Sequence, residues 1–429
     1  MELHNLSNEK SWKGKPTIDQ ITDSVVGEET DHEIISFSHG VDRDTEGGSS
    51  FLAYFNVVCV VAGTGALSLP YALKQGGWID SGIVLIRSLY YNGRTRLSSY
   101  QEVAEAAFGK IGGWISFFFT AVTLIGVPVL YILLAGQNIH SLCMGTAGEL
   151  TFALWVIICT VVVAIPFIFF KSMKEVGFLS AFGMLCTVIV VLIVLVMAVK
   201  DKPNQINVHH DNVIWDQFPI ALSSIVFSFG GNPVYAHVEA GMRHPQNWNK
   251  VILAGLSTCS AIYFLTAIPG YYVYGNQAQS PIYNSIPEGG AKIASEIIIT
   301  LHVLMAVPIL LTSFALDLEK MFGISSFNHS RPVEFLLRFT LRMALMVIIC
   351  VLAIFVPFFG DFMSLLGAFS NCALILIFPV LFYLKLTGIR NKHWAELFLC
   401  FFVVLLGIVG LIFGTKSAIE ALISDFANQ

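Results

Sequence analysis

Charged side chains are scarce in this chain of 429 residues: Asp, Glu, Lys and Arg together make up 12% of it, and 55% is hydrophobic. Soluble domains carry about 25% charged residues, so the composition excludes an ordinary soluble protein. The formal net charge is −5, which predicts no basic surface for nucleic acid. We therefore expect a polytopic membrane protein that contacts the lipid bilayer and binds no nucleic acid.

Metal-binding and catalytic motifs are also missing. None of the eight cysteines forms a Cys-x-x-Cys pair, and no His-x-x-x-His spacing occurs, so a metal site is not indicated. Seven of the cysteines lie inside or at the edges of apolar stretches, which disfavours a disulfide framework. No catalytic dyad is recognisable, and we expect neither an enzyme nor a bound cofactor.

The beginning of the chain has few large apolar residues and no recognisable signal peptide. Its first 49 residues hold eleven Asp and Glu against four Lys and Arg. Such a segment cannot bury enough apolar surface to fold, so residues 1–49 are predicted to be a disordered acidic tail. A transmembrane domain is predicted over 50–414, followed by a C-terminal tail at 415–429.

Long hydrophobic runs fill the rest of the sequence. Runs near or above about 18 residues indicate membrane spans, and ten are predicted. They cover 50–73, 113–138, 151–170, 176–199, 215–238, 250–274, 292–314, 335–358, 360–382 and 394–414. From residue 92 onward, basic loops alternate with loops poor in Lys and Arg, which marks the basic loops as cytoplasmic.

Two of these spans contain residues that a continuous helix disfavours. Residues 60–77 read VVAGTGALSLPYALKQGG, and residues 226–242 read VFSFGGNPVYAHVEAGM. Gly and Pro weaken helix interiors, and a break within the membrane is tolerated only where it is buried in protein or lines a cavity. A pair of broken segments, one in each half of the chain, indicates the midplane site of a secondary transporter built from inverted repeats.

One crossing is missing from this arrangement. Only WIDSGIVLIRSLYY (78–91) separates the first broken span from a basic loop. Fourteen residues make a helix of about 21 Å, shorter than a hydrocarbon core of about 30 Å. In an inverted repeat the chain must return across the membrane here. The expected fold is an all-α membrane protein with two inverted five-helix repeats, broken first and sixth helices, one extra span, and a truncated second span.

The broken segments predict a site for a zwitterion. Where a helix unwinds, one half presents free carbonyls and the other presents free N–H groups with partial positive charge. We assign the substrate carboxylate to the amides around Gly63, Thr64 and Gly65, and the ammonium group to carbonyls in the second break. These carbonyls belong to Phe227, Ser228, Phe229 and Gly230. The alternative is that the small residues serve only close helix packing.

Coupling to an ion needs an ionisable group inside the membrane, where charges are rare and usually functional. His237 and Glu239 lie in the second broken segment and are the candidate coupling residues. Glu239 has an alternative position at the cytoplasmic interface, near Arg243. Asp361 is expected to be a loop or capping residue, and His302 a packed helix residue rather than a proton carrier.

Four motifs carry a resemblance to a known family: GTGALSLPYALKQGGW (63–78), SSYQEVAEAAFG (98–109), FSFGGN (227–232) and MRHP (242–245). Together they resemble the amino acid/auxin permease family, in particular its vacuolar amino acid transporter branch. The resemblance runs from about residue 50 to 414. It implies a secondary amino acid transporter with eleven spans in inverted five-helix repeats, driven by protons or, in one branch, by sodium.

Three departures from the family pattern qualify this resemblance. About fifteen residues of the second span look removed after Trp78, in agreement with the missing crossing. Cys59 stands where the sodium-coupled branch carries Asn, and a thiol is a poor ligand for a hard cation, so proton coupling is favoured. Asn232 and Ala236 stand where many relatives carry a histidine and a proline.

The sequence thus predicts a transporter of neutral amino acids in a vacuolar or other endomembrane, coupled to protons and working by alternating access. Neutral substrates are favoured because no charged residue lies within either break, although Lys74 is near. Two alternatives stay open: an amino acid sensor that signals through the acidic tail without net transport, and an inactive isoform that lacks a complete second span.

Overall fold

The structure is a computed structural model that describes residues 47–63, 67, 97, 99–170, 173–205, 208–209, 218–324, 328–356, 358–390 and 392–427. The predicted acidic tail lies almost wholly outside these ranges, and the short stretch 78–91 lies entirely outside them. Within the described ranges the chain is helical, and the only β-type contact is an isolated bridge between Gly48 and Met242.

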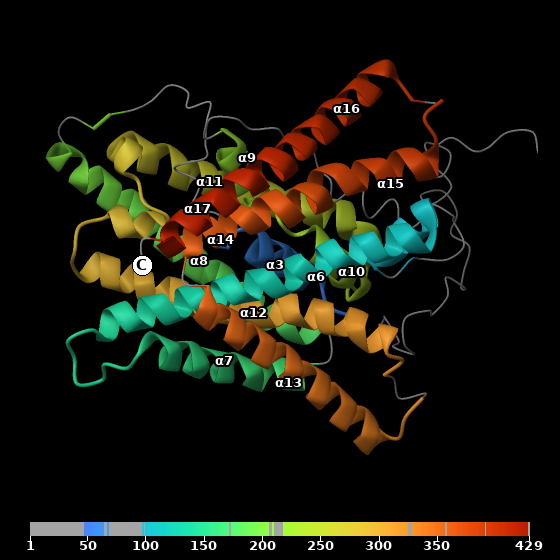
Figure 1. Cartoon of the computed structure of the whole chain (residues 1–429), viewed down its shortest axis with the longest axis horizontal. Coiled ribbons are helices and arrows are strands. Elements are labelled where there is room, and N and C mark those ends of the chain that lie inside the picture. The colour runs from blue at the N-terminus through green and yellow to red at the C-terminus, as the bar shows by residue number, and fades with distance from the viewer. Residues whose placement is uncertain are drawn as a thin grey trace, which may run out of the picture.

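Long helices and shorter ones make up the described part of the chain (Figure 1). The first half contains α3 (Ser50–Val61), α6 (Tyr100–Cys143), α7 (Phe152–Phe169) and α8 (Met173–Asp201). The second half contains α9 (Phe218–Ser228), α10 (Asn232–Ala240), α11 (Trp248–Tyr274), α12 (Gly290–Met321), α13 (Arg331–Phe355), α14 (Phe359–Leu366), the π-helix η7 (Gly367–Ile377), α15 (Phe378–Thr387), α16 (Trp394–Val409), the π-helix η8 (Gly410–Gly414) and α17 (Thr415–Ala427). Some of these helices are joined by short 3-10 turns, namely η2 (Lys202–Asn204), η4 (Pro245–Asn247), η5 (Gly275–Gln277) and η6 (Ile282–Ser285).

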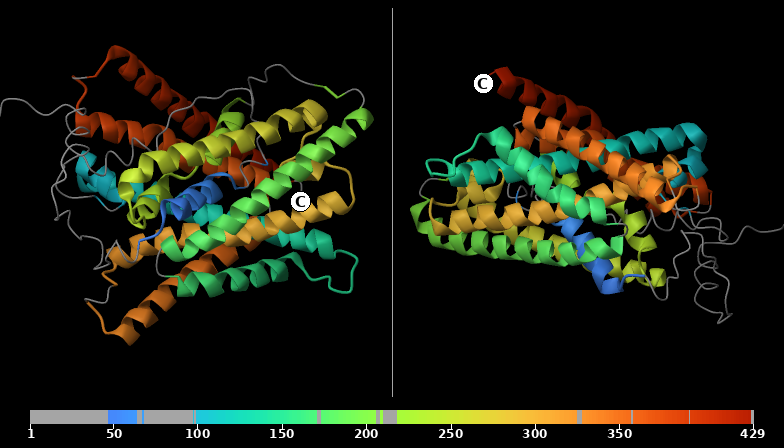
Figure 2. Two further views of the ribbon diagram at one scale, coloured as in Figure 1. Left: turned by 180° about the vertical axis from the view of Figure 1, so that it is seen from behind. Right: turned by 90° about the horizontal axis from the view of Figure 1, so that it is seen from below.

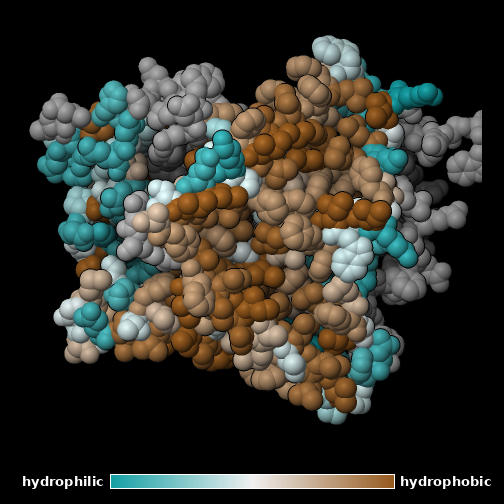
Figure 3. Space-filling model, in the orientation of Figure 1, coloured by the Kyte–Doolittle hydropathy of each residue, from teal (hydrophilic) through white to brown (hydrophobic). Residues whose placement is uncertain are grey.

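Eight helical segments of the described residues are long and apolar enough to cross a membrane. They coincide with the eight predicted spans that carry no break. The surface agrees with this interpretation, because a hydrophobic belt lies between two hydrophilic ends (Figure 3). Two segments extend furthest past their predicted limits: α6 continues in both directions around 113–138, and α17 carries the last span beyond residue 414.

The two predicted breaks are confirmed where the structure describes them. In the second half, the helix stops at Ser228 and starts again at Asn232. In the first half, α3 stops at Val61, well before the predicted end of that span at residue 73. Both short helices end at the Gly-rich sequences that led us to expect an interruption, because these residues have little preference for a helix interior.

The two broken segments run in opposite directions. Gly48, just before α3, donates its N–H to the Gly241 carbonyl over 2.8 Å, and Arg243 donates to the Gly48 carbonyl over 2.8 Å. The start of α3 therefore lies at the same end of the molecule as the end of α10. From there α3 enters the centre of the protein and packs between α8 and α11 (Figure 2). This opposite orientation is what an inverted repeat requires.

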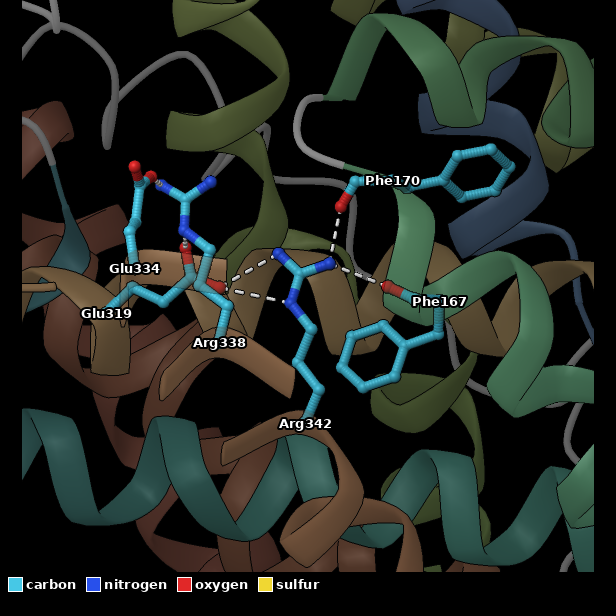
Figure 4. Close-up of polar contacts among 6 residues, drawn as sticks. All are labelled: Phe167, Phe170, Glu319, Glu334, Arg338 and Arg342. Atoms are coloured by element: carbon cyan, nitrogen blue, oxygen red, sulfur yellow. Dashed lines mark hydrogen bonds and ion pairs between the residues drawn. The ribbon is translucent and has the colours of Figure 1, made fainter. Parts of the chain in front are cut away.

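A buried charge cluster fastens α12 to α13 and α7 (Figure 4). Arg342 is 1% exposed and donates to Glu319 from Nε over 3.0 Å and from Nη2 over 2.9 Å. Its Nη1 donates to the Phe167 carbonyl over 2.6 Å and also to the Phe170 carbonyl. Both carbonyls lie at the C-terminal end of α7. Arg338 contacts the same Glu319 over 3.3 Å. The guanidinium thus satisfies helix-end carbonyls that would otherwise lack donors.

Replacing this arginine tests the cluster. Arg342→Met removes the charge that neutralises buried Glu319, and breaking a buried pair from one side costs about 3–5 kcal/mol. We expect a clear fall in thermal stability in detergent, measured with a thiol-reactive dye that reports exposure of the buried Cys59 and Cys259. Arg338→Met is the matched control, because that side chain is 20% exposed and its loss leaves Glu319 paired. Equal losses in the two variants would contradict this account.

Candidate functional site

The second break is a tight turn between two half-helices. Phe229 donates its N–H to the Val226 carbonyl over 3.1 Å, and Gly230 donates to the Phe227 carbonyl over 3.0 Å. Gly231 then donates to the Phe229 carbonyl over 2.8 Å, and α10 begins at the next residue. The turn replaces the usual i to i−4 bonds by shorter ones, so the Val226, Phe227 and Phe229 carbonyls stay paired within the turn, while the Ser228 carbonyl is contacted by Tyr263 of another helix.

The first break likewise leaves a carbonyl to another helix. Ala62 donates its N–H to the Val58 carbonyl over 2.7 Å, which is the last helical bond of α3. Gly63 follows it outside the helix. Of the three residues assigned to the substrate carboxylate, Gly63 is described, whereas Thr64 and Gly65 lie outside the described residues. In the last turn of α3, the Val61 carbonyl accepts from the Tyr263 hydroxyl of another helix.

One tyrosine on α11 connects the two breaks. The hydroxyl of Tyr263 lies 2.5 Å from the Val61 carbonyl oxygen and also contacts the Ser228 carbonyl oxygen. Tyr263 is 4% exposed, and its ring meets Phe229 edge to face with centroids 5.1 Å apart. A phenol has one proton to donate, so only one of the two carbonyls is satisfied at a time. The other can accept from an ammonium group.

A small cavity lies beside these ends. Its volume is about 10 Å³, roughly the space of one water. The described residues that line it are Val60, Val61, Val127, Tyr131, Phe227, Gly230, Leu310 and Asn371. They come from α3, α6, α9, the second break, α12 and η7. The two broken segments therefore meet at one cavity, which is too small for an amino acid in this conformation.

Two glycines let other side chains come close to the breaks. A Cβ at Gly63 would collide with the Tyr131 hydroxyl, and one at Gly230 would lie 2.9 Å from Nδ2 of Asn371. Both distances are shorter than real Cβ contacts, so any larger residue would displace these polar groups. The glycines thus have a role in close approach at the site, which supports the functional interpretation over simple helix packing.

Asn371 is a site residue that the sequence did not reveal. It is 1% exposed, and its Oδ1 accepts from the Thr123 hydroxyl over 3.2 Å. Its Nδ2 has no hydrogen-bond partner among the described residues and faces Gly230 at the cavity wall. The residue sits in the π-helix η7, a distortion often found at functional sites. The feature of the sequence that could have identified this residue is its side-chain amide within the apolar run 360–382.

The predicted substrate residues separate into those at the cavity and those behind it. Phe227 and Gly230 line the cavity. Ser228 offers its carbonyl to Tyr263, while its hydroxyl donates to the Ser224 carbonyl over 2.8 Å. Phe229 packs on Tyr263. Binding of an amino acid by these groups stays a prediction, now with Tyr131, Tyr263 and Asn371 beside them.

The two candidate coupling residues lie away from the cavity. Nε2 of His237 is 3.1 Å from Oδ1 of Asp317, and both side chains are 11% exposed. This pair joins α10 to the end of α12 that leads into the basic loop. Glu239 is 1% exposed, two residues further along α10. Neither residue is among the described residues that line the cavity, and their coupling role stays a prediction.

Two broken helices that meet at a buried cavity within an otherwise helical membrane domain define a secondary transporter of the inverted-repeat class. A solved structure of a Na+-coupled sialic acid symporter has this fold, with a TM-score of 0.53 at 13% identity over 89% of this chain and 92% of that one. The likeness shows the fold alone. A model of the family described as "Transmembrane amino acid transporter protein" matches residues 46–420.

The chain therefore belongs to the amino acid/auxin permease family, whose members are transporters rather than enzymes. It is 27% identical over 404 residues to amino acid transporter AVT1I of Arabidopsis thaliana, covering 90% of this chain and 98% of that protein. It is also 28% identical over 409 residues to the proton-coupled amino acid transporter-like protein pathetic of Drosophila melanogaster, covering 86% and 84%. The resemblance stated from the sequence motifs is thus confirmed.

Removing one hydroxyl group tests the connection between the breaks. Tyr263→Phe keeps the ring but leaves two buried carbonyls without their shared donor, a loss of about 1–3 kcal/mol. We expect a lower unfolding temperature in detergent. Tyr271→Phe on the same helix is the control, because its hydroxyl contacts exposed Asn276 over 3.4 Å. If the two variants unfold at the same temperature, the bridge does not stabilise the breaks.

Proposed function

We propose that this chain is a secondary active transporter that moves neutral amino acids across a vacuolar or other endomembrane, driven by protons and working by alternating access. The observation that carries the proposal is the meeting of two oppositely directed broken helices at one buried cavity. The Val61 and Ser228 carbonyls share one phenol proton, so one of them can accept from an ammonium group, and the sequence after the first break is the proposed position for a carboxylate. A zwitterion presents both charges to one site.

Neutral substrates are supported by the character of the cavity. Each described side chain that lines it is uncharged, and most are aliphatic or aromatic. A charged substrate side chain would enter a low-dielectric site without a partner, which is strongly unfavourable. An apolar or small side chain meets no such penalty. We therefore expect small or aliphatic amino acids to be better substrates than lysine, arginine or glutamate.

Proton coupling is supported by the surroundings of Cys59, near the end of α3. The thiol is 0% exposed and packs against Gly183 of α8, whose added Cβ would lie 2.8 Å from Sγ. Sodium prefers oxygen ligands, and a protonated thiol is a poor substitute. The printed name of the Drosophila relative, a proton-coupled amino acid transporter-like protein, agrees with this proposal.

An endomembrane location rests on the resemblance of the motifs to the vacuolar branch of the family. Alternating access rests on the size of the cavity, because about 10 Å³ has no room for an amino acid and a rearrangement is required before one binds.

The direct test is uptake by proteoliposomes that contain the purified full chain. With an acidic outside and a panel of amino acids, we expect accumulation of neutral substrates above their equilibrium level. Accumulation should disappear when a protonophore dissipates the gradient, and replacing sodium by choline should leave it unchanged. Absence of uptake for every amino acid, under either direction of the pH gradient, would contradict the proposal and favour the sensor or inactive alternatives.

Asn371 offers a test of the site itself. Asn371→Leu removes the N–H donor that faces Gly230, and a lost hydrogen bond of about 1–3 kcal/mol predicts a KM raised about 5- to 100-fold. Ser364→Ala is the matched control in the same membrane segment, because its hydroxyl bonds only the Gly360 carbonyl of its own helix. An unchanged KM in Asn371→Leu, at normal expression, would show that the amide takes no part in binding.

A further inference from the structure

His302 was expected to be a packed helix residue rather than a proton carrier, and the structure shows it packed, with one ring nitrogen paired and the other without a hydrogen-bond partner among the described residues. It lies in the middle of α12, is 0% exposed, and is enclosed by residues of α3, α6 and α8. Its Nδ1 is 2.8 Å from the Gly183 carbonyl oxygen and 3.0 Å from the Thr187 hydroxyl. A carbonyl only accepts hydrogen bonds, so Nδ1 carries the hydrogen and the neutral ring has its lone pair on Nε2.

That lone pair points at the first break. Nε2 has no hydrogen-bond partner among the described residues, and a Cβ added to Gly63 would lie 3.3 Å from it. The Tyr131 ring lies on the same side, with its centroid 6.5 Å from that of the imidazole. A buried acceptor without a partner costs about 1–3 kcal/mol and calls for a reason. A structural histidine would have had both nitrogens satisfied.

The groups that face the ring carry no charge at neutral pH. They are the thiol of Cys59 on α3, the hydroxyl of Thr187 on α8 and the phenol of Tyr131 on α6. On α12 itself, Glu296 is six residues before His302 (296 to 302), about 9 Å by helical rise, and Asp317 is fifteen residues after it (302 to 317), about 22 Å. Within the described ranges no ion pair includes His302, whereas His237 is paired with Asp317.

Protonation at Nε2 would therefore place an unpaired positive charge beside the break. Such a charge is unfavourable when the site is empty and favourable when a carboxylate is bound next to it. Binding of the proton and binding of the amino acid then strengthen each other, and by linkage the effect is reciprocal. This mutual dependence is what obligatory cotransport requires, because neither ligand alone stabilises the loaded site.

We propose that Nε2 of His302 binds the transported proton, and that the resulting imidazolium holds the substrate carboxylate at the first break. The proton enters with the amino acid and leaves Nε2 for water on the opposite side after the substrate departs. This inference rests on the proposed function, because it assumes that a proton and an amino acid share the site between α3, α8 and α12.

The experiment compares two transport modes in proteoliposomes for the wild type and for His302→Asn and His302→Gln. The Asn variant keeps a donor near Nδ1 for Gly183, the Gln variant places an amide near Nε2, and neither titrates. We expect both to lose accumulation driven by the pH gradient, by at least about tenfold, while counterflow exchange of labelled for unlabelled substrate at equal pH continues in His302→Gln, because its amide N–H can still donate to the substrate carboxylate. His140→Asn is the matched control, since this histidine bonds only the Leu150 carbonyl in a loop.

The wild type supplies a second readout that does not depend on how the variants fold. Its KM in counterflow should rise with pH by up to about tenfold per pH unit once the binding group is deprotonated, and the KM of His302→Gln should be flat. A wild-type KM that stays constant between pH 5 and about pH 8 would overturn the inference. So would a His302 variant that still accumulates substrate within about twofold of wild type.

The outcomes separate this inference from the proposed function. If the wild type shows no uptake driven by the pH gradient, the proposed function fails first. If the wild type is driven and the His302 variants are driven as well, the proposed function stands and only the role of His302 falls. His237→Asn completes the comparison: loss of coupling there, with coupling retained in the His302 variants, assigns the proton to the His237–Asp317 pair.

Discussion

A backbone that leaves the helical form inside a membrane must find partners for its carbonyl and amide groups, because lipid offers none. This constraint determines the centre of the molecule. The Tyr263 hydroxyl lies between the carbonyl ends of α3 and α9, and the helices around it provide the enclosure in which such ends are tolerated. The cavity, the close approach at Gly63 and Gly230, and the polar atoms of Asn371 and His302 all lie around this meeting point.

Much of the fold could be predicted from the sequence because its signals are local. Apolar length and basic loops predicted the eight continuous spans, and Gly and Pro predicted where the helices break. The extent of α6 was less predictable. Its first turns, from Tyr100 to Phe108, carry polar residues and are joined to the span through Gly109 at φ 70°. A search for unbroken apolar runs therefore places the start of this helix too late in the sequence.

The site was only half predictable, for a physical reason. Gly63 and Phe227–Gly230 belong to the breaks, so the Gly-rich sequences that predict the breaks also predict these site residues. Tyr263, Asn371 and His302 are single polar residues in apolar spans, where the sequence cannot separate a satisfied group from an unsatisfied one. His302 shows this directly, because one ring nitrogen is paired with Gly183 and the other is not. That difference depends on helices more than a hundred residues away in the chain.

The helix α12 connects the site to the end of the molecule that carries the basic loop after residue 320. His302 lies near its middle, while Asp317, Glu319 and Lys320 at its end pair with α10, α13 and α6 respectively. Pro308 lies between these two regions and lacks the N–H for a helical bond there. A change in charge at His302 and a change in contacts at the helix end thus both act on α12. They act from opposite sides of the turn that Pro308 weakens.

The position of Tyr263 has a mechanical consequence. Its hydroxyl has one proton and two carbonyl acceptors on different half-helices, so rotation of the O–H about the C–O bond exchanges one acceptor for the other. The two half-helices are therefore joined by a contact that a single bond rotation can reassign.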